Sequence, residues 1–217
     1  MKDDIMVASP PKRGTLAYLE AFPDEVLTMT LDEYWELEPQ NQYKSTFFQN
    51  KVTAIMPYTA KTHNRLSRRL VYALSAAVEE NGAELFYETR PVWIAPAELN
   101  TYPDIFIVEK SNEVRRRGKM TAETTPSVII EILSDSTEHE DRGKKMRAYK
   151  QLPTVEQIVL VSQNEPLVEV YERGESVGKW VVSEFYGMDK TVEIAGITVS
   201  LATLYAGINF NESEETV

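Results

Sequence analysis

The stretch SVIIEILSDST, residues 127 to 137, constrains the fold more than any other part of the chain. A short run of branched aliphatic residues bounded by polar turn residues predicts a strand that is buried on both faces of a central sheet. Glu131 lies in the middle of this run, and a buried carboxylate is costly unless it is protonated, paired with a cation or bound to a metal. The strand therefore predicts a partner for Glu131 as well as a core.

A second acidic residue, Asp104, stands between Pro103 and the apolar run 105–108. If the two predicted strands are neighbours, Asp104 and Glu131 meet at one end of the sheet. Their oxygens would there form a site suited to Mg²⁺ or Mn²⁺. Each residue has an alternative interpretation: Asp104 as a strand-end acid that accepts hydrogen bonds, and Glu131 as the partner of an internal arginine such as Arg90.

The hydrophobic pattern predicts two longer helices, over about 62–80 and 137–151. A short helix over 31–37 begins at a capping box formed by Thr30 and Glu33. A hairpin is expected at 45–48 and 52–56, and its strands are followed by those at 85–90, 92–95, 104–108, 128–133, 157–161, 167–171, 180–185 and within 192–204.

This order of elements predicts an α/β or α+β domain with a central mixed sheet flanked by helices. The hairpin and the last strands are extra elements at its two ends. We expect a flexible lead-in over residues 1–27, a single domain over 28–205 and an acidic tail over 206–217.

Charge is unevenly distributed along the 217 residues, whose formal net charge is -11. Residues 41–150 hold seventeen basic and fourteen acidic groups, whereas both flanks are acidic. Because Lys and Arg drive binding to nucleic-acid phosphates, this central half of the chain is the expected contact region. The candidate contacts are Arg65, Arg68, Arg115, Arg116, Arg117 and Arg142, although each basic cluster is also compatible with an ordinary solvated face.

Composition excludes several classes of function. The absence of cysteine excludes disulfides, thiolate metal sites and cysteine nucleophiles, and only two histidines, His63 and His139, count against a multi-histidine zinc site. No apolar run is long enough to span a bilayer, and the first residues lack the apolar segment of a signal peptide. We expect a cytoplasmic protein that does not enter membranes.

The predicted helix over 137–151 supplies a cation. Each helical residue advances by about 100°, so Lys145 shares a side with Asp141 and Tyr149, both four positions away. If Met146, Tyr149 and Leu152 pack on the sheet, Lys145 borders the buried seam and reaches toward the carboxylates. Two carboxylates, a lysine and a divalent cation form a site for phosphodiester hydrolysis. The alternative is a solvated helical lysine.

Here the sequence resembles the putative restriction endonuclease family of uncharacterised bacterial proteins, a branch of the PD-(D/E)xK nuclease superfamily. The resemblance covers roughly residues 28 to 205 and rests on Pro103-Asp104, Glu131-Ile-Leu-Ser134-x-Ser136-Thr137, Asp141-x-x-x-Lys145-x-x-x-Tyr149 and Gln157-Ile-Val-Leu-Val161.

The resemblance implies a restriction-endonuclease-like fold, Mg²⁺ or Mn²⁺ held by Asp104 and Glu131, a DNA substrate and a homodimer. It also implies that Lys145 is the active-site lysine. Many superfamily members carry that lysine two positions after the acid, but Leu133 stands there in this chain. The helix would then supply it, as in relatives within the family.

One departure from the family pattern concerns the hairpin. A glutamate and an Asp-Gly turn are usual there, whereas this chain reads Tyr43-Lys-Ser-Thr-Phe-Phe-Gln-Asn-Lys51. His63 falls where the family often has a histidine, and His63, Glu88 and Asp141 are the auxiliary candidates. Three hypotheses stay open: a metal-dependent nuclease, a nuclease-fold protein that only binds nucleic acid or protein, and an acidic interaction protein. The choice between DNA and RNA is also open.

Overall fold

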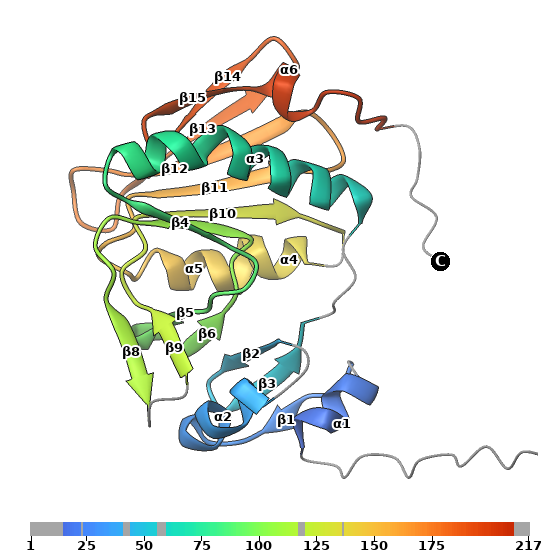
Figure 1. Cartoon of the computed structure of the whole chain (residues 1–217), viewed down its shortest axis with the longest axis vertical. Coiled ribbons are helices and arrows are strands. Elements are labelled where there is room, and N and C mark those ends of the chain that lie inside the picture. Colours follow the sequence, from blue (N-terminus) through green and yellow to red (C-terminus); the bar gives the residue numbers. More distant parts are fainter. Residues whose placement is uncertain are drawn as a thin grey trace, which may run out of the picture.

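Figure 1 shows the computed structural model, which describes residues 15–22, 24–40, 44–55, 60–116, 120–135 and 137–210. A six-stranded sheet runs in the spatial order β13 (Trp180–Tyr186), β12 (Leu167–Arg173), β11 (Gln157–Ser162), β10 (Val128–Leu133), β7 (Ile105–Val108) and β4 (Glu84–Tyr87). Strand β10 is parallel to β11 and antiparallel to β7. The sheet is therefore mixed and flanked by helices, which confirms the predicted fold class.

Strand β10 is buried along its whole length, as its apolar run predicted. Its alternate residues Val128, Ile130 and Ile132 belong to one core, while Ile129 and Leu133 belong to another on the opposite face. Successive side chains of a strand point to opposite faces. Glu131 therefore shares the face of Ile129 and Leu133.

Helix α3 (Lys61–Glu80) covers the other face of this sheet. Its buried residues Leu66, Leu70, Leu74 and Val78 recur every fourth position, which places them on one side of the helix. The hairpin of β14 (Thr191–Ile194) and β15 (Ile197–Ser200), with α6 (Leu201–Leu204), completes the same core. No described helix is long and apolar enough to cross a membrane.

The helical segment after β10 packs on the Glu131 face, so α3 and this segment lie on opposite sides of the sheet (Figure 1). It consists of α4 (Glu138–Glu140), a π-helical turn (Asp141–Lys145) and α5 (Met146–Tyr149). Met146, Tyr149 and Leu152 are buried against the sheet, as predicted. The π-helical turn replaces the continuous α-helix that the sequence predicted. Such turns often occur at functional sites.

A second sheet runs in the order β1 (Leu27–Thr28), β3 (Lys51–Ala54), β2 (Ser45–Phe48), β6 (Leu99–Thr101), β5 (Val92–Ile94), β9 (Met120–Glu123) and β8 (Glu113–Arg116). The predicted hairpin is its β2–β3 pair. Gln49 and Asn50 join the strands with φ angles of 48° and 65°, the left-handed values that a two-residue hairpin turn requires. The sequence pattern did not predict β6, β8 and β9.

Elements of regular structure and core contacts occur within both segments that the sequence assigned to the ends of the chain. Within the expected lead-in, α1 (Leu16–Ala21) and β1 bury Leu19 and Leu27 in a third core, which α2 (Leu31–Leu37) completes. The capping box of α2 is present as predicted. Within the expected tail, Ile208 and Phe210 pack against the core that α3 covers. Residues 1–14 and 211–217 lie outside the described residues.

Candidate active site

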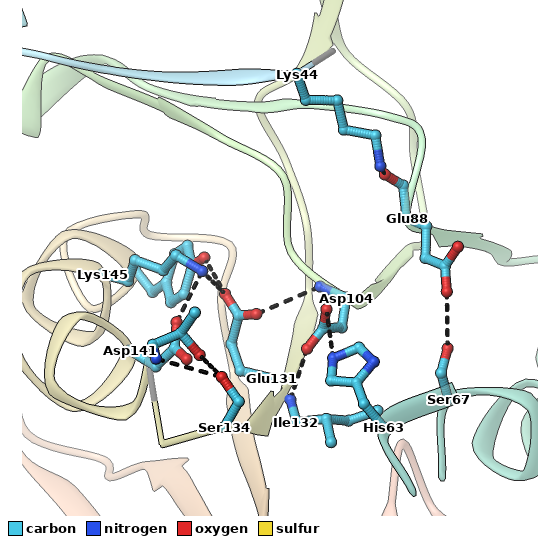
Figure 2. A network of polar contacts seen from close by, with 12 residues as sticks. Lys44, His63, Ser67, Glu88, Asp104, Glu131, Ile132, Ser134, Asp141 and Lys145 are labelled. Atoms are coloured by element: carbon cyan, nitrogen blue, oxygen red, sulfur yellow. Dashed lines mark hydrogen bonds and ion pairs between the residues drawn. The ribbon is translucent and has the colours of Figure 1, made fainter. Parts of the chain in front are cut away.

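Asp104 and Glu131 lie side by side at one end of the six-stranded sheet (Figure 2). The antiparallel register pairs Ile130 with Ile105, so its next step sets Glu131 opposite Asp104. The backbone N–H of Asp104 donates to Glu131 Oε2 over 3.3 Å. The backbone N–H of Ile132 donates to Asp104 Oδ2 over 2.7 Å. Strand register thus brings together the two carboxylates that the sequence singled out.

Glu131 is buried, with 2% of its surface exposed, and receives two further donors. Lys145 Nζ lies 3.2 Å from Glu131 Oε1, and the Tyr149 hydroxyl donates to the same oxygen over 2.5 Å. Burial raises the pKa of Glu131 to about 8; Lys145 opposes the rise, and the charges of Asp141 and Asp104 add to it. The internal partner of Glu131 is therefore Lys145.

The alternative partner of Glu131, Arg90, is engaged elsewhere. Its guanidinium pairs with Glu113 and with the fully buried Glu123. This contradicts the interpretation of Glu131 as half of an Arg90 ion pair.

Lys145 is held between two carboxylates. Its ammonium lies 2.7 Å from Asp141 Oδ1, at the other end of the π-helical turn, in addition to its contact with Glu131. Burial alone lowers the pKa of Lys145, but the charges of Glu131 and Asp141 outweigh it and raise the pKa above its ordinary value. Lys145 is therefore a fixed cation at the site, and only 13% of its side chain is exposed.

His63 stands at the first turn of α3 and faces Asp104, with Nε2 3.2 Å from Asp104 Oδ1. Burial lowers the pKa of His63, but the hydrogen bond to Asp104 and the charges of Asp104, Glu88 and Glu131 raise it to a net value above the ordinary one. His63 therefore orients Asp104, and its auxiliary role in catalysis stays a prediction.

Glu88 and Lys44 border the Asp104 side of the site (Figure 2). Glu88 Oε1 accepts a long hydrogen bond of 3.5 Å from the Ser67 hydroxyl on α3. Lys44 Nζ donates to the backbone carbonyl of Glu88 and lies 5.5 Å from the centre of the Tyr102 ring. The Glu88 backbone N–H donates to the Asp104 carbonyl over 3.0 Å, so Glu88 borders the carboxylate pair on its Asp104 side.

The donor set fits a hard divalent cation. A carboxylate oxygen has two lone pairs, so Asp104 and Glu131 keep acceptor capacity beside their present hydrogen bonds. Within the described ranges, no group of three or more His, Cys, Asp or Glu side chains is arranged to hold a metal alone. Mg²⁺ commonly binds through one or two carboxylates and completes its shell with water and phosphate oxygens. The pair is thus compatible with Mg²⁺ or Mn²⁺ bound together with a substrate.

The candidate nucleic-acid contacts are not equivalent. Arg142 pairs with Glu169 and Glu138, and Arg65 donates to the carbonyl of Gly207 over 3.5 Å, so both have partners within the chain. Arg68 is exposed on α3. Arg115 and Arg116 lie on β8, where their side chains are not described, and Arg117 lies outside the described residues.

A cavity of about 590 Å³ lies at the opposite end of the sheet. Its lining includes Ile107 and Val128, the far ends of β7 and β10 from Asp104 and Glu131. Two buried polar side chains of its lining have partners within the chain: Gln157 donates to the Glu193 carbonyl and accepts from the Ala195 N–H, and the Ser127 hydroxyl donates to the Ile107 carbonyl. The carboxylates therefore lie outside the cavity.

Two residues of the site were missed by sequence reasoning. Tyr149 had been expected only as a core residue, yet its hydroxyl contacts Glu131. Its spacing of four from Lys145 was the available signal, since it places both on the face that meets Glu131. Lys44 gave no such signal, because its approach to Asp104 depends on how the second sheet sits beside the first.

Known proteins resemble this chain in fold and in sequence. A putative nuclease of the DUF820 group from Anabaena variabilis has the same fold, with a TM-score of 0.63, 22% identity, and coverage of 82% of this chain and 97% of that one. Two uncharacterized proteins of Synechocystis sp. are similar in sequence. One is 30% identical over 77% of this chain and 93% of its own length, and the other is 25% identical over 82% and 92%.

The family match covers residues 31–203, which include every site residue described above. This range holds both carboxylates, the lysine-bearing helical segment and the strands that position them. The chain therefore belongs to the Uma2 family, whose description is "Putative restriction endonuclease".

Proposed function

We propose that this protein is a metal-dependent endonuclease that hydrolyses DNA phosphodiester bonds. The observation that carries the proposal is the meeting of Asp104 and Glu131 at one sheet end, with the Lys145 ammonium 3.2 Å from Glu131. Membership of the family and the shared fold support a nuclease-like function. We further propose that it acts in the cytoplasm as a homodimer, since two copies suit the cutting of two strands.

In this proposal, Asp104 and Glu131 would hold Mg²⁺ or Mn²⁺, which supplies Lewis acidity toward the phosphate. Lys145 places a positive charge next to Glu131, where it stabilises negative charge that develops on the phosphate oxygens. His63 and the Ile132 N–H fix Asp104, and the Tyr149 hydroxyl fixes Glu131. Each carboxylate is thus held in one orientation before the substrate arrives.

The first test is calorimetric titration with Mn²⁺ of the wild-type protein and of Asp104→Asn and Glu131→Gln. We expect the wild type to bind and both substitutions to weaken binding at least about tenfold, because each removes a charged ligand. Circular dichroism confirms folding of the variants. Glu109→Gln, an acidic residue of the distant cavity, serves as the matched control and should bind as the wild type does. Absence of binding at millimolar Mn²⁺ would contradict the metal-dependent mechanism.

A second candidate function is binding of nucleic acid without cleavage. It is favoured by the internal donors on Asp104 and Glu131, because Lys145, His63 and backbone N–H groups already compensate these carboxylates. The absence of the family's usual hairpin glutamate from residues 43–51 also favours this second function. Under this alternative the protein binds DNA in a salt-dependent manner, and added Mn²⁺ produces neither binding heat nor cleavage.

A further inference from the structure

Lys44 lies on the segment that leads into β2, and its side chain points across to the first sheet (Figure 2). Its ammonium donates to the Glu88 carbonyl, and Glu88 in turn donates its backbone N–H to the Asp104 carbonyl over 3.0 Å. Glu88 therefore connects Lys44 to Asp104, the proposed metal ligand.

The charges around Lys44 link it to the site. Burial lowers the pKa of Lys44, and the negative charges of Glu88 and Asp104 act in the opposite direction. These two carboxylates therefore interact electrostatically with the ammonium, although its hydrogen bond is made to a backbone carbonyl. Together with Lys145 on the Glu131 side, Lys44 gives the site one fixed cation at each edge.

We propose that Lys44 is an internal counter-cation of the carboxylate pair and weakens the binding of a divalent metal at Asp104 and Glu131. The inference rests on the proposed function, since it concerns the same site. A positive charge beside Asp104 repels an incoming cation. It also reduces the negative electrostatic potential of the carboxylates that would attract that cation. The metal would therefore bind more tightly once the phosphates of a substrate add negative charge.

A purely structural role for Lys44 makes the opposite prediction. Glu88 adopts a left-handed backbone conformation, with φ of 55°, and the Lys44 hydrogen bond to its carbonyl helps to hold this turn. If Lys44 served only to hold the turn, its removal would loosen the site and lower the affinity for the metal. The sign of the change in affinity thus separates the two roles.

The experiment is Mn²⁺ titration calorimetry on the full chain without substrate. The variants are Lys44→Met, Lys44→Glu and Lys44→Arg, with Lys51→Met as the control because Lys51 is an exposed lysine of the same hairpin. We expect Lys44→Met to tighten Mn²⁺ binding about tenfold, as removal of one nearby unit charge does in a partly hydrated site. Lys44→Glu should tighten it further, whereas Lys44→Arg and Lys51→Met should match the wild type.

Three results would overturn the inference. If Lys44→Met binds Mn²⁺ as the wild type does while Asp104→Asn abolishes binding, the proposed function stands and the role of Lys44 falls. If Lys44→Met binds more weakly than the folded wild type and Lys44→Arg restores affinity, Lys44 is a structural residue. If even Lys44→Glu binds no Mn²⁺ at millimolar concentration, both proposals fall.

Discussion

At the scale of single residues, Glu131 explains most of the site. A carboxylate in a buried strand has few ways of meeting its desolvation cost, and the fold uses three of them: the Lys145 ammonium, the Tyr149 hydroxyl and the Asp104 N–H. Its pKa of about 8 shows that these partners do not fully offset burial. A further cation, such as a bound metal, would favour the ionised form.

The Tyr149 hydroxyl is the partner that can be removed most cleanly. We expect Tyr149→Phe to lower the free energy of unfolding at pH 7 by about 0.5 to 1.5 kcal/mol, the range for a hydrogen bond between neutral groups, because a pKa of about 8 leaves Glu131 mostly protonated there. Urea denaturation with circular dichroism detection measures this loss. Tyr72→Phe is the matched control, because Tyr72 is 90% exposed on α3 and should leave the stability unchanged. Equal stability of the two variants would mean that the Tyr149 hydrogen bond contributes nothing.

At the scale of elements, the helical segment from α4 to α5 is fastened to the sheet at both sides. Lys145 and Tyr149 contact β10 through Glu131, while Arg142 pairs with Glu169 on β12. The Tyr171 hydroxyl donates to the same Glu169 carboxylate over 3.0 Å. Arg142 was predicted as a nucleic-acid contact, but the structure gives it this partner within the chain. Its position thus favours a structural role.

The Arg142–Glu169 pair predicts a pH dependence of stability. The hydrogen bonds from Arg142, with help from Tyr171, hold the pKa of Glu169 below its ordinary value despite burial. Such a group stabilises the fold above its unfolded pKa and loses this contribution as pH falls through its folded pKa. We expect Glu169→Gln to lose about 1 kcal/mol at pH 7, a modest amount because Arg142 is partly exposed.

The difference between wild type and Glu169→Gln should begin to shrink as pH falls below about 4, the ordinary range of a glutamate, and vanish once pH is below the depressed pKa of the folded state. Thermal unfolding followed across pH 3 to 8 gives this comparison. Glu175→Gln, an exposed substitution beyond the end of β12, is the control. A difference that persists unchanged at low pH would show that charge is not the source of the contribution.

The elements that could be predicted from the sequence are those whose apolar pattern is long enough to be read locally. Strand β10 has a nearly continuous apolar run, and helix α3 has an apolar residue at every fourth position. Both elements were predicted closely. Strand β6 has three residues, and two of them are the buried polar residues Asn100 and Thr101. No local hydrophobic pattern therefore predicts this strand. The same holds within the site. Asp104 and Glu131 are anomalous in their own strands, whereas the role of Lys44 depends on contacts between sheets.

At the scale of the whole molecule, an acidic net charge is compatible with the proposed DNA substrate because the basic residues are unevenly distributed. The site combines Lys44, Lys145 and His63 with its carboxylates, and the exposed Arg68 lies on the helix that carries His63. A few basic groups close to the site must therefore provide most of the attraction for phosphates, against repulsion by the acidic flanks.

This distribution predicts a shallow salt dependence of DNA binding. We expect the logarithm of the binding constant to fall linearly with the logarithm of salt concentration, and Arg68→Gln to reduce the slope by about 0.9, as loss of one phosphate contact does. Fluorescence anisotropy with a labelled DNA duplex measures both slopes. Lys190→Gln, an exposed lysine next to β14, is the control. A slope unaffected by Arg68→Gln would remove α3 from the interface.

The parallel pairing of β10 with β11 has a consequence for how the protein matures. A parallel pair needs a crossover, and here the crossover is the helical segment that carries Asp141 and Lys145. During synthesis, the two carboxylates emerge well before the strand that completes their sheet neighbourhood, and contacts so distant in sequence form slowly. The nascent chain would thus complete the surroundings of the carboxylate pair only after Gln157–Ser162 has left the ribosome, and the proposed hydrolytic activity would stay silent until the domain has folded.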